Sequence, residues 1–283
     1  MLWLDGQLVE GGPVPFDLGD RGLLLGDGVF DTALALNGRV AFAAAHRDRL
    51  VAAAASLGFA VAPERIEEAM QALAERFARA AIRTTVTRGP GPRGLRPPSD
   101  PRPVVFAGAA PSPAGLAGAP LRLLPAEIRR NETSPASRLK TLGYLDAVLA
   151  ARAAAAEGFD EALFRNTRGA VACAGTGNLF AILGRDLVTP PLADGVLPGI
   201  VRAEVLRLAP ACGLAGQERS LPLAEWLRAD AVLLTNSLRL LAPVAAIGAT
   251  SFDSARHPAV LQLATALRER IAADCGVPAG AVA

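Results

Sequence analysis

The sequence predicts an α+β protein of two domains, on the basis of three observations. β-rich and helical stretches alternate along the chain, 51% of the 283 residues are apolar, and one stretch of small residues, prolines and glycines separates two halves. That stretch is Gly108–Pro120, and its composition favours a connection. We expect an N-terminal α/β domain over 1–110, a linker over 111–120 and a C-terminal domain over 121–283.

The N-terminal domain is expected to contain two hairpins, two helices and two further strands. The hairpins turn at Asp5-Gly6 and Asn37-Gly38, which are residue pairs that favour tight turns between antiparallel strands. Apolar residues at helical spacing predict the helices, and the first helix stops at Gly58. The predicted ranges are 44–59 and 63–80 for the helices, and 81–89 and 102–110 for two strands that flank a proline-rich loop.

The C-terminal domain is expected to begin with a strand and to end with a long helix. Glycine pairs mark the turns of two hairpins, and proline or glycine marks the helix ends. The expected elements are a strand over 121–125, a helix over 144–158, hairpins turning at Arg168-Gly169 and Gly184-Arg185, a helix over 199–213, a strand over 229–237 and a helix over 257–276.

The composition argues against several classes of partner. The formal charge is +2 and basic runs do not alternate with aromatic residues, so nucleic acid is not expected. The apolar runs are too short to cross a bilayer, and Met1 leads directly into charges and turn glycines rather than a signal peptide. Cys173, Cys212 and Cys275 are odd in number and widely spaced, which predicts reduced thiols in the cytoplasm and no metal site.

Lys140, in the stretch SRLKTLGYLD, is the one lysine among 29 basic residues, and Tyr144 is the one tyrosine. Arginine serves wherever only positive charge is needed, but it does not lose its proton and is a poor nucleophile. A lysine amine can be deprotonated and can form a Schiff base with a carbonyl group. The sequence therefore marks Lys140 as a candidate catalytic residue; a surface lysine retained by chance is the alternative, and packing is the role expected of Tyr144.

Two further stretches could bind an anion. In VLPGIVR a helix opens just after Gly199, where free backbone N–H groups and the positive end of the helix dipole meet. Thr235, Asn236 and Ser237 follow an apolar strand and offer donor side chains at its end. An ordinary helix start and a polar turn are the alternatives. A Schiff-base lysine and a phosphate cradle together fit one cofactor, pyridoxal 5′-phosphate (PLP).

With these motifs in the right order, nearly the whole chain resembles the class IV PLP-dependent aminotransferases. The stretches that carry the resemblance are DRGLLLGDGVFDTALALNG, HRDRL, SRLKTLGYLDAVLA, GNLFAI and VLPGIVR. The resemblance implies fold type IV, like D-amino acid aminotransferase, with the cofactor at the domain interface in a homodimer. The residue roles it implies are the Schiff base for Lys140, phosphate contacts for Arg49, Gly199, Ile200 and Val201, and ring contacts for Asn178 and Leu197. Asn236 and Ser237 are phosphate candidates because of their place at the end of the strand.

The chain departs from the pattern of the resembled family at three positions. Cys173 stands where the family has a glutamate that hydrogen-bonds the pyridine nitrogen. A thiol is a weak hydrogen-bonding partner and is mostly neutral near pH 7, so we predict slower or altered chemistry. Val201 replaces a threonine of the phosphate turn, and Phe30 stands where D-amino acid aminotransferases have a tyrosine beside the cofactor and substrate.

Three functions are compatible with this pattern. Transfer of an amino group from an amino acid to a 2-oxo acid, with Lys140 as the base, is the commonest activity of the resembled family. The stretches TNSLRLLAPV and TRGPGPRG resemble aminodeoxychorismate lyase instead, which forms 4-aminobenzoate and pyruvate by β-elimination. A PLP-binding protein with weak or no catalysis is the third. Arg93, in the second of these stretches, could pair with a substrate carboxylate as a bidentate fork, or it could be a surface arginine.

Overall fold

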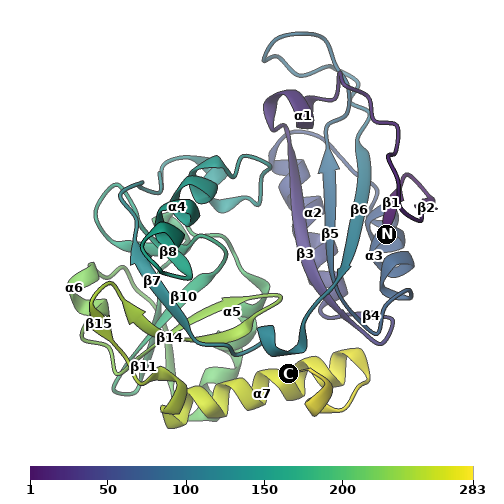
Figure 1. The fold of residues 1–283 in the computed structure, drawn as a ribbon. Coiled ribbons are helices and arrows are strands. Elements are labelled where there is room, and N and C mark those ends of the chain that lie inside the picture. Colours follow the sequence, from purple (N-terminus) through teal and green to yellow (C-terminus); the bar gives the residue numbers. More distant parts are fainter. Residues whose placement is uncertain (283) are drawn as a thin grey trace. The chain divides into compact units, whose positions relative to one another are not determined.

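The computed structural model describes residues 1–282, and the chain divides into two compact units (Figure 1). Unit 1 contains Met1–Pro113 together with two segments from later in the chain, Leu139–Gly143 and Ala273–Val277. Unit 2 contains the rest of the described chain. Lys140 therefore belongs to unit 1, although it follows the predicted linker in sequence.

Unit 1 is a twisted sheet with two helices on one face. The sheet has the strand order β2-β1-β6-β5-β3-β4, and all its strand pairs are antiparallel. The strands are β1 (Leu2–Leu4), β2 (Gln7–Val9), β3 (Gly28–Leu36), β4 (Arg39–Val40), β5 (Arg79–Thr87) and β6 (Val104–Pro111). The helices are α1 (Arg21–Leu25), α2 (Ala43–Ser56) and α3 (Pro63–Ala74).

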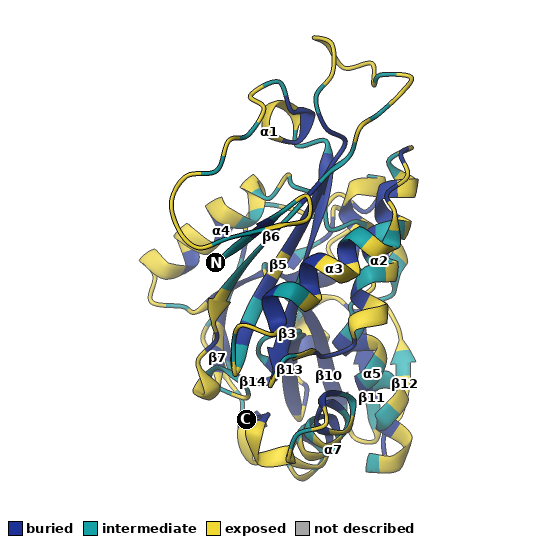
Figure 2. Ribbon diagram, turned by 90° about the vertical axis from the view of Figure 1, so that its right-hand side faces the viewer, coloured by how far each residue is buried: buried dark blue, intermediate teal, exposed yellow. Residues whose placement is uncertain are grey.

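The core of unit 1 lies between the sheet and the helices α2 and α3, and Figure 2 shows the buried strands behind the partly exposed helices. Val29, Leu50, Ile66 and Leu73 are fully buried in this core. Apolar residues at helical spacing supply the core positions of α2 and α3, as the sequence predicts. β3 is buried along nearly its whole length rather than at alternate positions. The face of α2 toward the sheet also carries His46, which becomes important below.

The two predicted N-terminal hairpins are confirmed, and two other predictions need correction. β1 pairs with β2 across Asp5-Gly6, and β3 pairs with β4 across Asn37-Gly38. The second helix ends at Ala74 rather than at residue 80, because Arg79 and Ala80 already pair in β5. The helix α1 was not predicted from the sequence; its first amides are capped by the side chain of Asp20.

Unit 2 is built on a larger, mixed sheet with the strand order β12-β11-β10-β13-β14-β7-β8-β9, and β15 pairs with β14. The strands are β7 (Leu121–Pro125), β8 (Glu161–Arg165), β9 (Val171–Ala174), β10 (Asn178–Leu183), β11 (Asp186–Thr189), β12 (Ala215–Glu218), β13 (Ala231–Asn236), β14 (Leu240–Ile247) and β15 (Thr250–Ser251). The helices are α4 (Leu145–Ala156), α5 (Ile200–Leu208), α6 (Leu223–Trp226) and α7 (Pro258–Cys275).

Two apolar clusters stabilise unit 2. One surrounds Trp226, Leu179 and Leu234, and the other joins Ala150 and Ala154 of α4 to strands β8 and β9. The predicted hairpins β8–β9 and β10–β11 are confirmed, and α5 ends before Pro210 as expected. The two sheets with their helices confirm the predicted α+β class. None of the helices among the described residues is long and apolar enough to cross a membrane.

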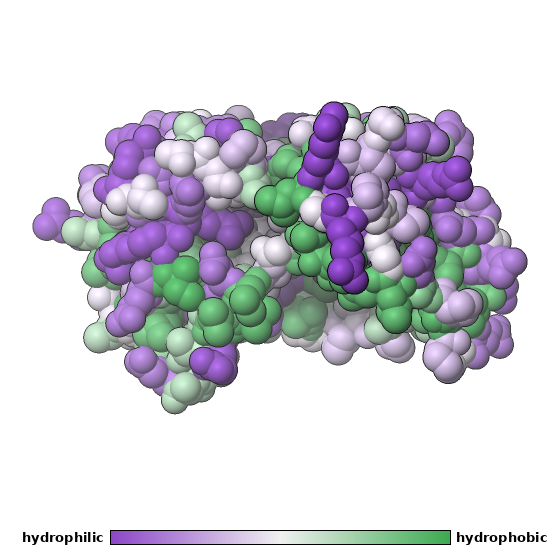
Figure 3. All heavy atoms as spheres, turned by 90° about the horizontal axis from the view of Figure 1, so that it is seen from above, coloured by the Kyte–Doolittle hydropathy of each residue, from purple (hydrophilic) through white to green (hydrophobic). Residues whose placement is uncertain are grey.

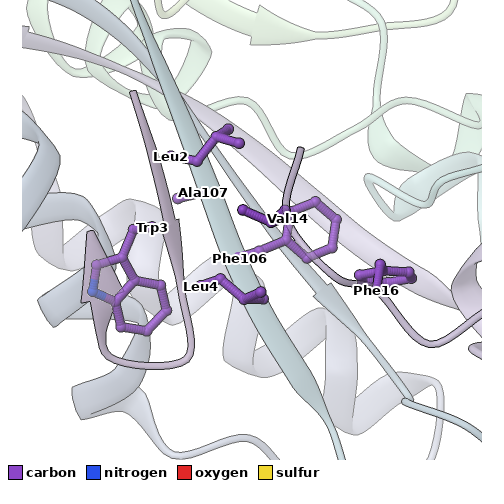
Figure 4. A pocket seen from close by; sticks show the side chains of 7 residues that line it. All are labelled: Leu2, Trp3, Leu4, Val14, Phe16, Phe106 and Ala107. Carbon is purple, nitrogen blue, oxygen red and sulfur yellow. The ribbon is translucent and has the colours of Figure 1, made fainter. Parts of the chain in front are cut away.

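An apolar pocket of about 300 Å³ lies in unit 1, apart from the residues that the sequence marks for chemistry. Figure 4 shows Val14 beside the ring of Phe106 and Phe16 beyond it, while the side chain of Trp3 points to the other side of its strand from Leu2 and Leu4. The rings of Phe16 and Phe106 meet edge to face, with their centroids 5.6 Å apart. The lining is entirely apolar, so this pocket does not fit an anionic substrate.

Candidate cofactor and active site

The segment that carries Lys140 is hydrogen-bonded to strand β3 of unit 1. The amide of Phe30 donates to the carbonyl of Lys140 at 2.8 Å, and the amide of Leu142 donates to the carbonyl of Gly28 at 3.1 Å. A Cβ atom on Gly28 would lie 2.7 Å from the carbonyl oxygen of Val86 and 2.9 Å from a methyl of Leu142, so only glycine allows this close approach. The backbone of the lysine is therefore set by β3 rather than by a free loop.

The side chains of Lys140 and Arg83 share the ring of Phe30. The Lys140 Nζ lies 4.5 Å from the ring centroid, and the Arg83 Cζ lies 3.4 Å from it. Arg83 pairs with Thr32 on the neighbouring strand, which places it diagonally across from Phe30 on the same face of the sheet. Both cations are attracted to the π-electrons of one ring. The structure thus brings two of the predicted site residues, Phe30 and Lys140, together.

On the opposite face of β3, Asp31 holds the predicted phosphate arginine. Arg49 Nε donates to Asp31 Oδ2 at 2.8 Å, and Arg49 Nη2 donates to Asp31 Oδ1 at 2.7 Å. The Nδ1 of His46 lies 3.0 Å from Asp31 Oδ1. Since successive residues of a strand point to opposite faces, Phe30 faces Lys140 while Asp31 faces α2. His46 is buried and Arg49 is mostly so, which means that this pair does not lie on a solvated helix face.

The carboxyl group of Asp31 remains ionised at neutral pH. Burial alone would raise its pKa, but the charges and hydrogen bonds of His46 and Arg49 outweigh burial and hold the pKa far below its usual range. The ion pair presents the arginine in one orientation, with both bonds of the fork on the same carboxylate. Asp31 is therefore a positioning residue for Arg49.

In unit 2, the turn Leu197-Pro198-Gly199 leads into α5 and leaves the first amides of that helix without a capping side chain, because the N-cap residue is Gly199. Asn178 Nδ2 donates to the carbonyl of Leu197 at 3.0 Å and braces the turn. A Cβ on Gly199 would lie only 1.9 Å from Asn178 Oδ1. The site therefore needs glycine here, and Ile200 and Val201 supply the first helical amides.

A hydroxyl group without a partner lies beside this turn. Thr235 pairs with Asn178 across strands β13 and β10, so their side chains lie on one face of the sheet. Thr235 is 1% exposed, and among the described residues its Oγ1 has no hydrogen-bond partner. A buried polar group without a partner is costly unless a ligand satisfies it. The uncapped helix and the Thr235 hydroxyl together fit a phosphate group.

The other predicted residues of unit 2 divide into two groups. Cys173 is buried in the cluster that also contains Val196, just before the turn. Burial raises the pKa of its thiol, and nearby Glu161 raises it further, while Arg130 only partly offsets this, so the thiol is neutral. Asn236 is occupied with structural bonds: its Nδ2 donates to the carbonyl of Thr176, and its Oδ1 accepts two backbone amides. The half-buried Ser237 follows it.

The remaining candidate, Arg93, is exposed at the tip of the loop between β5 and β6. It belongs to unit 1, as do Lys140, Phe30 and Arg49. The structure brings together Lys140 with Phe30, and Asn178 with Leu197 and Gly199. Sequence reasoning missed Asp31, whereas Thr235 was among the three donor residues predicted at the end of the strand. A carboxylate inside the apolar run GVFDTALAL is the signal that could have found Asp31.

The family described as "Amino-transferase class IV" matches residues 28–247 of this chain. This range includes Lys140, the turn Leu197-Pro198-Gly199 and Thr235. The chain belongs to the class IV aminotransferase family. Fold type IV is confirmed by solved relatives. One protein that shares this fold, a hypothetical aminotransferase from Mycobacterium tuberculosis, has been solved in a PLP-bound form.

Three relatives show the spread of activities near this class IV chain. It is 35% identical, over 86% of each chain, to the Methanocaldococcus jannaschii protein named "Putative branched-chain-amino-acid aminotransferase". The structure resembles a "Putative 4-amino-4-deoxychorismate lyase" from Legionella pneumophila, with a TM-score of 0.83 and 31% identity over 91% of this chain and 96% of that one. It also resembles the branched-chain aminotransferase from Thermoproteus uzoniensis, with a TM-score of 0.88 and 26% identity over 96% and 95%.

Proposed function

We propose that this class IV enzyme uses PLP to transfer the amino group of an amino acid to a 2-oxo acid. The observation that carries the proposal is the placement of Lys140. It is the one primary-amine side chain of the protein, and both its backbone neighbours and its side chain are held against β3. When bound, PLP supplies an aldehyde that condenses with a primary amine and a ring that withdraws electrons.

The fit of the cofactor rests on the cradle of unit 2. Gly199, Ile200 and Val201 offer backbone amides at a helix start, and the buried hydroxyl of Thr235 awaits an acceptor. Phosphate supplies oxygens for both. Val201 lacks the hydroxyl of a threonine, so in this chain the amides and Thr235 carry more of the binding. Arg49 of unit 1, which Asp31 holds in one orientation, is the phosphate arginine that the family resemblance proposes.

The proposed catalytic role of Lys140 is proton transfer. Its amine would act as the base that takes the proton from the substrate Cα, and it would hold that proton for return later in the reaction. Phe30 keeps the amine near one position through its ring, and Arg83 on the same ring adds positive charge for an anionic substrate group. In this proposal these groups bind the substrate, orient it and move protons.

A second candidate function is the β-elimination that converts aminodeoxychorismate into 4-aminobenzoate and pyruvate. The neutral, buried thiol of Cys173 favours it, since a thiol does not hold a proton on a ring nitrogen as a carboxylate does. Elimination, which expels a leaving group next to the reacting carbon, tolerates weaker electron withdrawal than transamination. Arg93 is the proposed partner of a substrate carboxylate in either reaction.

The proposed form of the enzyme is a cytoplasmic homodimer. Large apolar side chains are exposed in both units, including Leu24 of α1 at 62% and Leu145 of α4 at 68%. Figure 3, which views the structure from the α1 end of Figure 1, shows apolar areas open to solvent between strongly hydrophilic side chains. A second copy of the chain would cover such areas. Sedimentation at a mass near twice 29.1 kDa tests this, and a monomer at micromolar concentration contradicts it.

Parallel assays of the PLP-loaded protein distinguish the functions. One set offers D- and L-amino acids with 2-oxoglutarate or pyruvate, and the other offers aminodeoxychorismate and follows pyruvate and 4-aminobenzoate. Transfer that is lost in Lys140→Ala but kept in the surface variant Arg47→Lys supports the proposal. Release of 4-aminobenzoate without transfer supports the lyase. PLP binding without either activity supports a binding protein and overturns both.

A further inference from the structure

A cluster of two arginines and one aspartate lies at the base of the loop that carries Arg93. Arg21 Nε and Arg88 Nε both donate to Asp27 Oδ2, each at 2.8 Å. The side chains of both arginines are 5% exposed. Burial acts to raise the pKa of Asp27, but the hydrogen bonds and charges of Arg88 and Arg21 outweigh it and lower the pKa, so the aspartate is ionised.

The second side of the Arg21 guanidinium holds the loop. Its Nη1 donates to the carbonyl of Gly94 at 3.0 Å, and its Nη2 donates to the carbonyl of Leu95 at 3.0 Å. A longer contact of 3.5 Å joins Nη1 to the carbonyl of Arg96. On the other side of Arg93, a Cβ on Gly91 would lie 3.0 Å from Arg21 Cδ. Arg21 therefore touches the loop both before and after Arg93.

Charge explains why the loop stays on Arg21. Two buried guanidinium groups face a single carboxylate, which leaves one positive charge that the aspartate does not neutralise. Carbonyl dipoles supply further compensation: Arg21 uses those of the loop, and Arg88 uses those of Leu57 at 2.5 Å and Gly58 at 3.3 Å at the end of α2. The Arg88 guanidinium also lies over the ring of Phe59, 4.7 Å from its centroid. A lysine lacks the planar fork and cannot donate to the carboxylate and two carbonyls in these directions.

The loop leaves the sheet at the end where Lys140 is held. Gly28 at the start of β3 pairs with Thr87 at the end of β5, and the backbone of Gly28 accepts from the lysine segment. The amide of Arg21 donates to the carbonyl of Gly89, two residues after Thr87. Within unit 1, the clamp, the loop and the lysine segment thus share one end of the sheet.

We propose that Arg21 is a positioning residue that clamps the Gly91–Arg96 loop, so that Arg93 presents its guanidinium to a carboxylate of the substrate. This deepens the proposed function, since it assigns an acidic substrate group to the Arg93 loop. Arg21 makes no contact with the substrate itself. Its role is to remove the conformational freedom of a loop rich in glycine and proline before the substrate binds.

Trypsin tests the clamp without any need for activity. The bond after Arg93 is exposed and precedes glycine, whereas the bond after Arg96 precedes proline and resists trypsin. In Arg21→Lys we expect cleavage after Arg93 to be about tenfold faster than in the native protein, which corresponds to ~1.4 kcal/mol in the opening equilibrium of the loop. Arg47→Lys, which alters a half-buried arginine of α2 paired with Asp48 and Glu67, is the matched control.

Stability is checked by thermal unfolding, and Asp27→Asn provides a second variant that keeps the guanidinium of Arg21. Should Arg21→Lys fail to fold, Asp27→Asn must show faster cleavage after Arg93. If Asp27→Asn also fails to fold, the rate of cleavage of the native protein tests the clamp by itself. Its bond after Arg93 must be cut at least tenfold more slowly than the same bond in a synthetic peptide of residues 86–104. Cleavage at the peptide's rate overturns the clamp.

Kinetics test what the clamp does for binding. With an acidic 2-oxo acid such as 2-oxoglutarate, we expect Arg21→Lys and Arg93→Gln each to raise KM about tenfold and to change kcat less than threefold, the pattern of lost binding. Faster cleavage with an unchanged KM would show a clamp that serves no substrate and would overturn the proposal. If the native protein has no transaminase or lyase activity, the proposed function fails. In that case, the 2-oxoglutarate affinity of the PLP-loaded protein, measured by calorimetry, must still fall tenfold in both variants.

Discussion

Substitution of Gly199 by alanine tests the phosphate cradle most selectively. The backbone at Gly199 has φ −72° and ψ 136°, which alanine adopts without strain, so only the added methyl group matters. That methyl would lie 1.9 Å from Asn178 Oδ1, whereas side-chain carbons essentially never approach other atoms below 3.0 Å. Either Asn178 or the turn must move by about 1 Å, and such overpacking costs ~1–3 kcal/mol.

This free-energy cost acts on Asn178, the side chain that braces the turn before the first amides of α5. Asn178 is 6% exposed and is tied to the carbonyl of Leu197, so it cannot rotate into solvent. If all of the cost appears in cofactor binding, the Kd for PLP rises roughly 5- to 150-fold. We would titrate the cofactor-free protein with PLP and follow the absorbance of the bound form, with inorganic phosphate as a competitor.

Gly115→Ala is the matched control, because Gly115 lies in the same unit and an added Cβ would meet no atom within 4 Å. The control should bind PLP as the native protein does. An unchanged PLP affinity in Gly199→Ala, together with unchanged phosphate competition, would refute the assignment of this turn as the phosphate site.

Three further substitutions test other parts of the site. Asp31→Asn leaves the cation Arg49 without its counter-charge, and urea unfolding at pH 7 should show a loss of ~3–5 kcal/mol. Since the folded-state pKa of Asp31 is depressed, this stabilisation is present above pH ~4 and is lost from the native protein as the pH falls further. The difference in the free energy of unfolding between the native protein and Asp31→Asn should therefore become smaller in acid. A difference that does not depend on pH contradicts the ion pair. Thr235→Val removes the unpartnered hydroxyl, and PLP affinity should fall about tenfold while stability is kept or raised; equal affinity argues against a ligand there. Cys173→Glu should change the absorbance of the bound cofactor and speed transamination, and identical spectra and rates would remove the role assigned to the thiol.

Much of the fold follows from local chemistry. The turn pairs Asp5-Gly6 and Asn37-Gly38 predict their hairpins because these residues adopt the positive φ angles that the turns need, and all four do so. The predicted secondary structure is wrong where pairing with strands distant in the sequence determines the conformation. Arg79 and Ala80 continue a helical pattern, yet they pair with β3 and β6, and this pairing overrides their local preference.

The helix α1 was missed for a related reason. Its stretch RGLLL looks like an apolar strand, but Leu23, Leu24 and Leu25 are exposed rather than buried. The helix depends on the cap from Asp20, whose second carboxylate oxygen accepts from Thr87, 67 residues away. A motif search does not register a cap that is fixed by such a distant partner.

The candidate site divides in the same way. Lys140 and Gly199 could be predicted as candidates from the sequence, because a unique primary amine and a helix that opens at glycine are local signals. Asp31 and Arg21 were not predicted as candidates, since Asp31 meets Arg49 only through the packing of α2 on β3, and Arg21 meets Gly94 only when the loop closes back. Residues that act through another residue leave little trace in the sequence.

The central claim is that the Nζ of Lys140 is the point where the cofactor is attached. Borohydride reduction of protein loaded with PLP, followed by peptide mass mapping, measures this directly. We expect one modified peptide, containing Ser137–Asp146, with the reduced cofactor on Lys140. A protein that is supplied with excess PLP and yields no modified lysine, or that carries the cofactor only on its N-terminal amine, contradicts the assignment of Lys140.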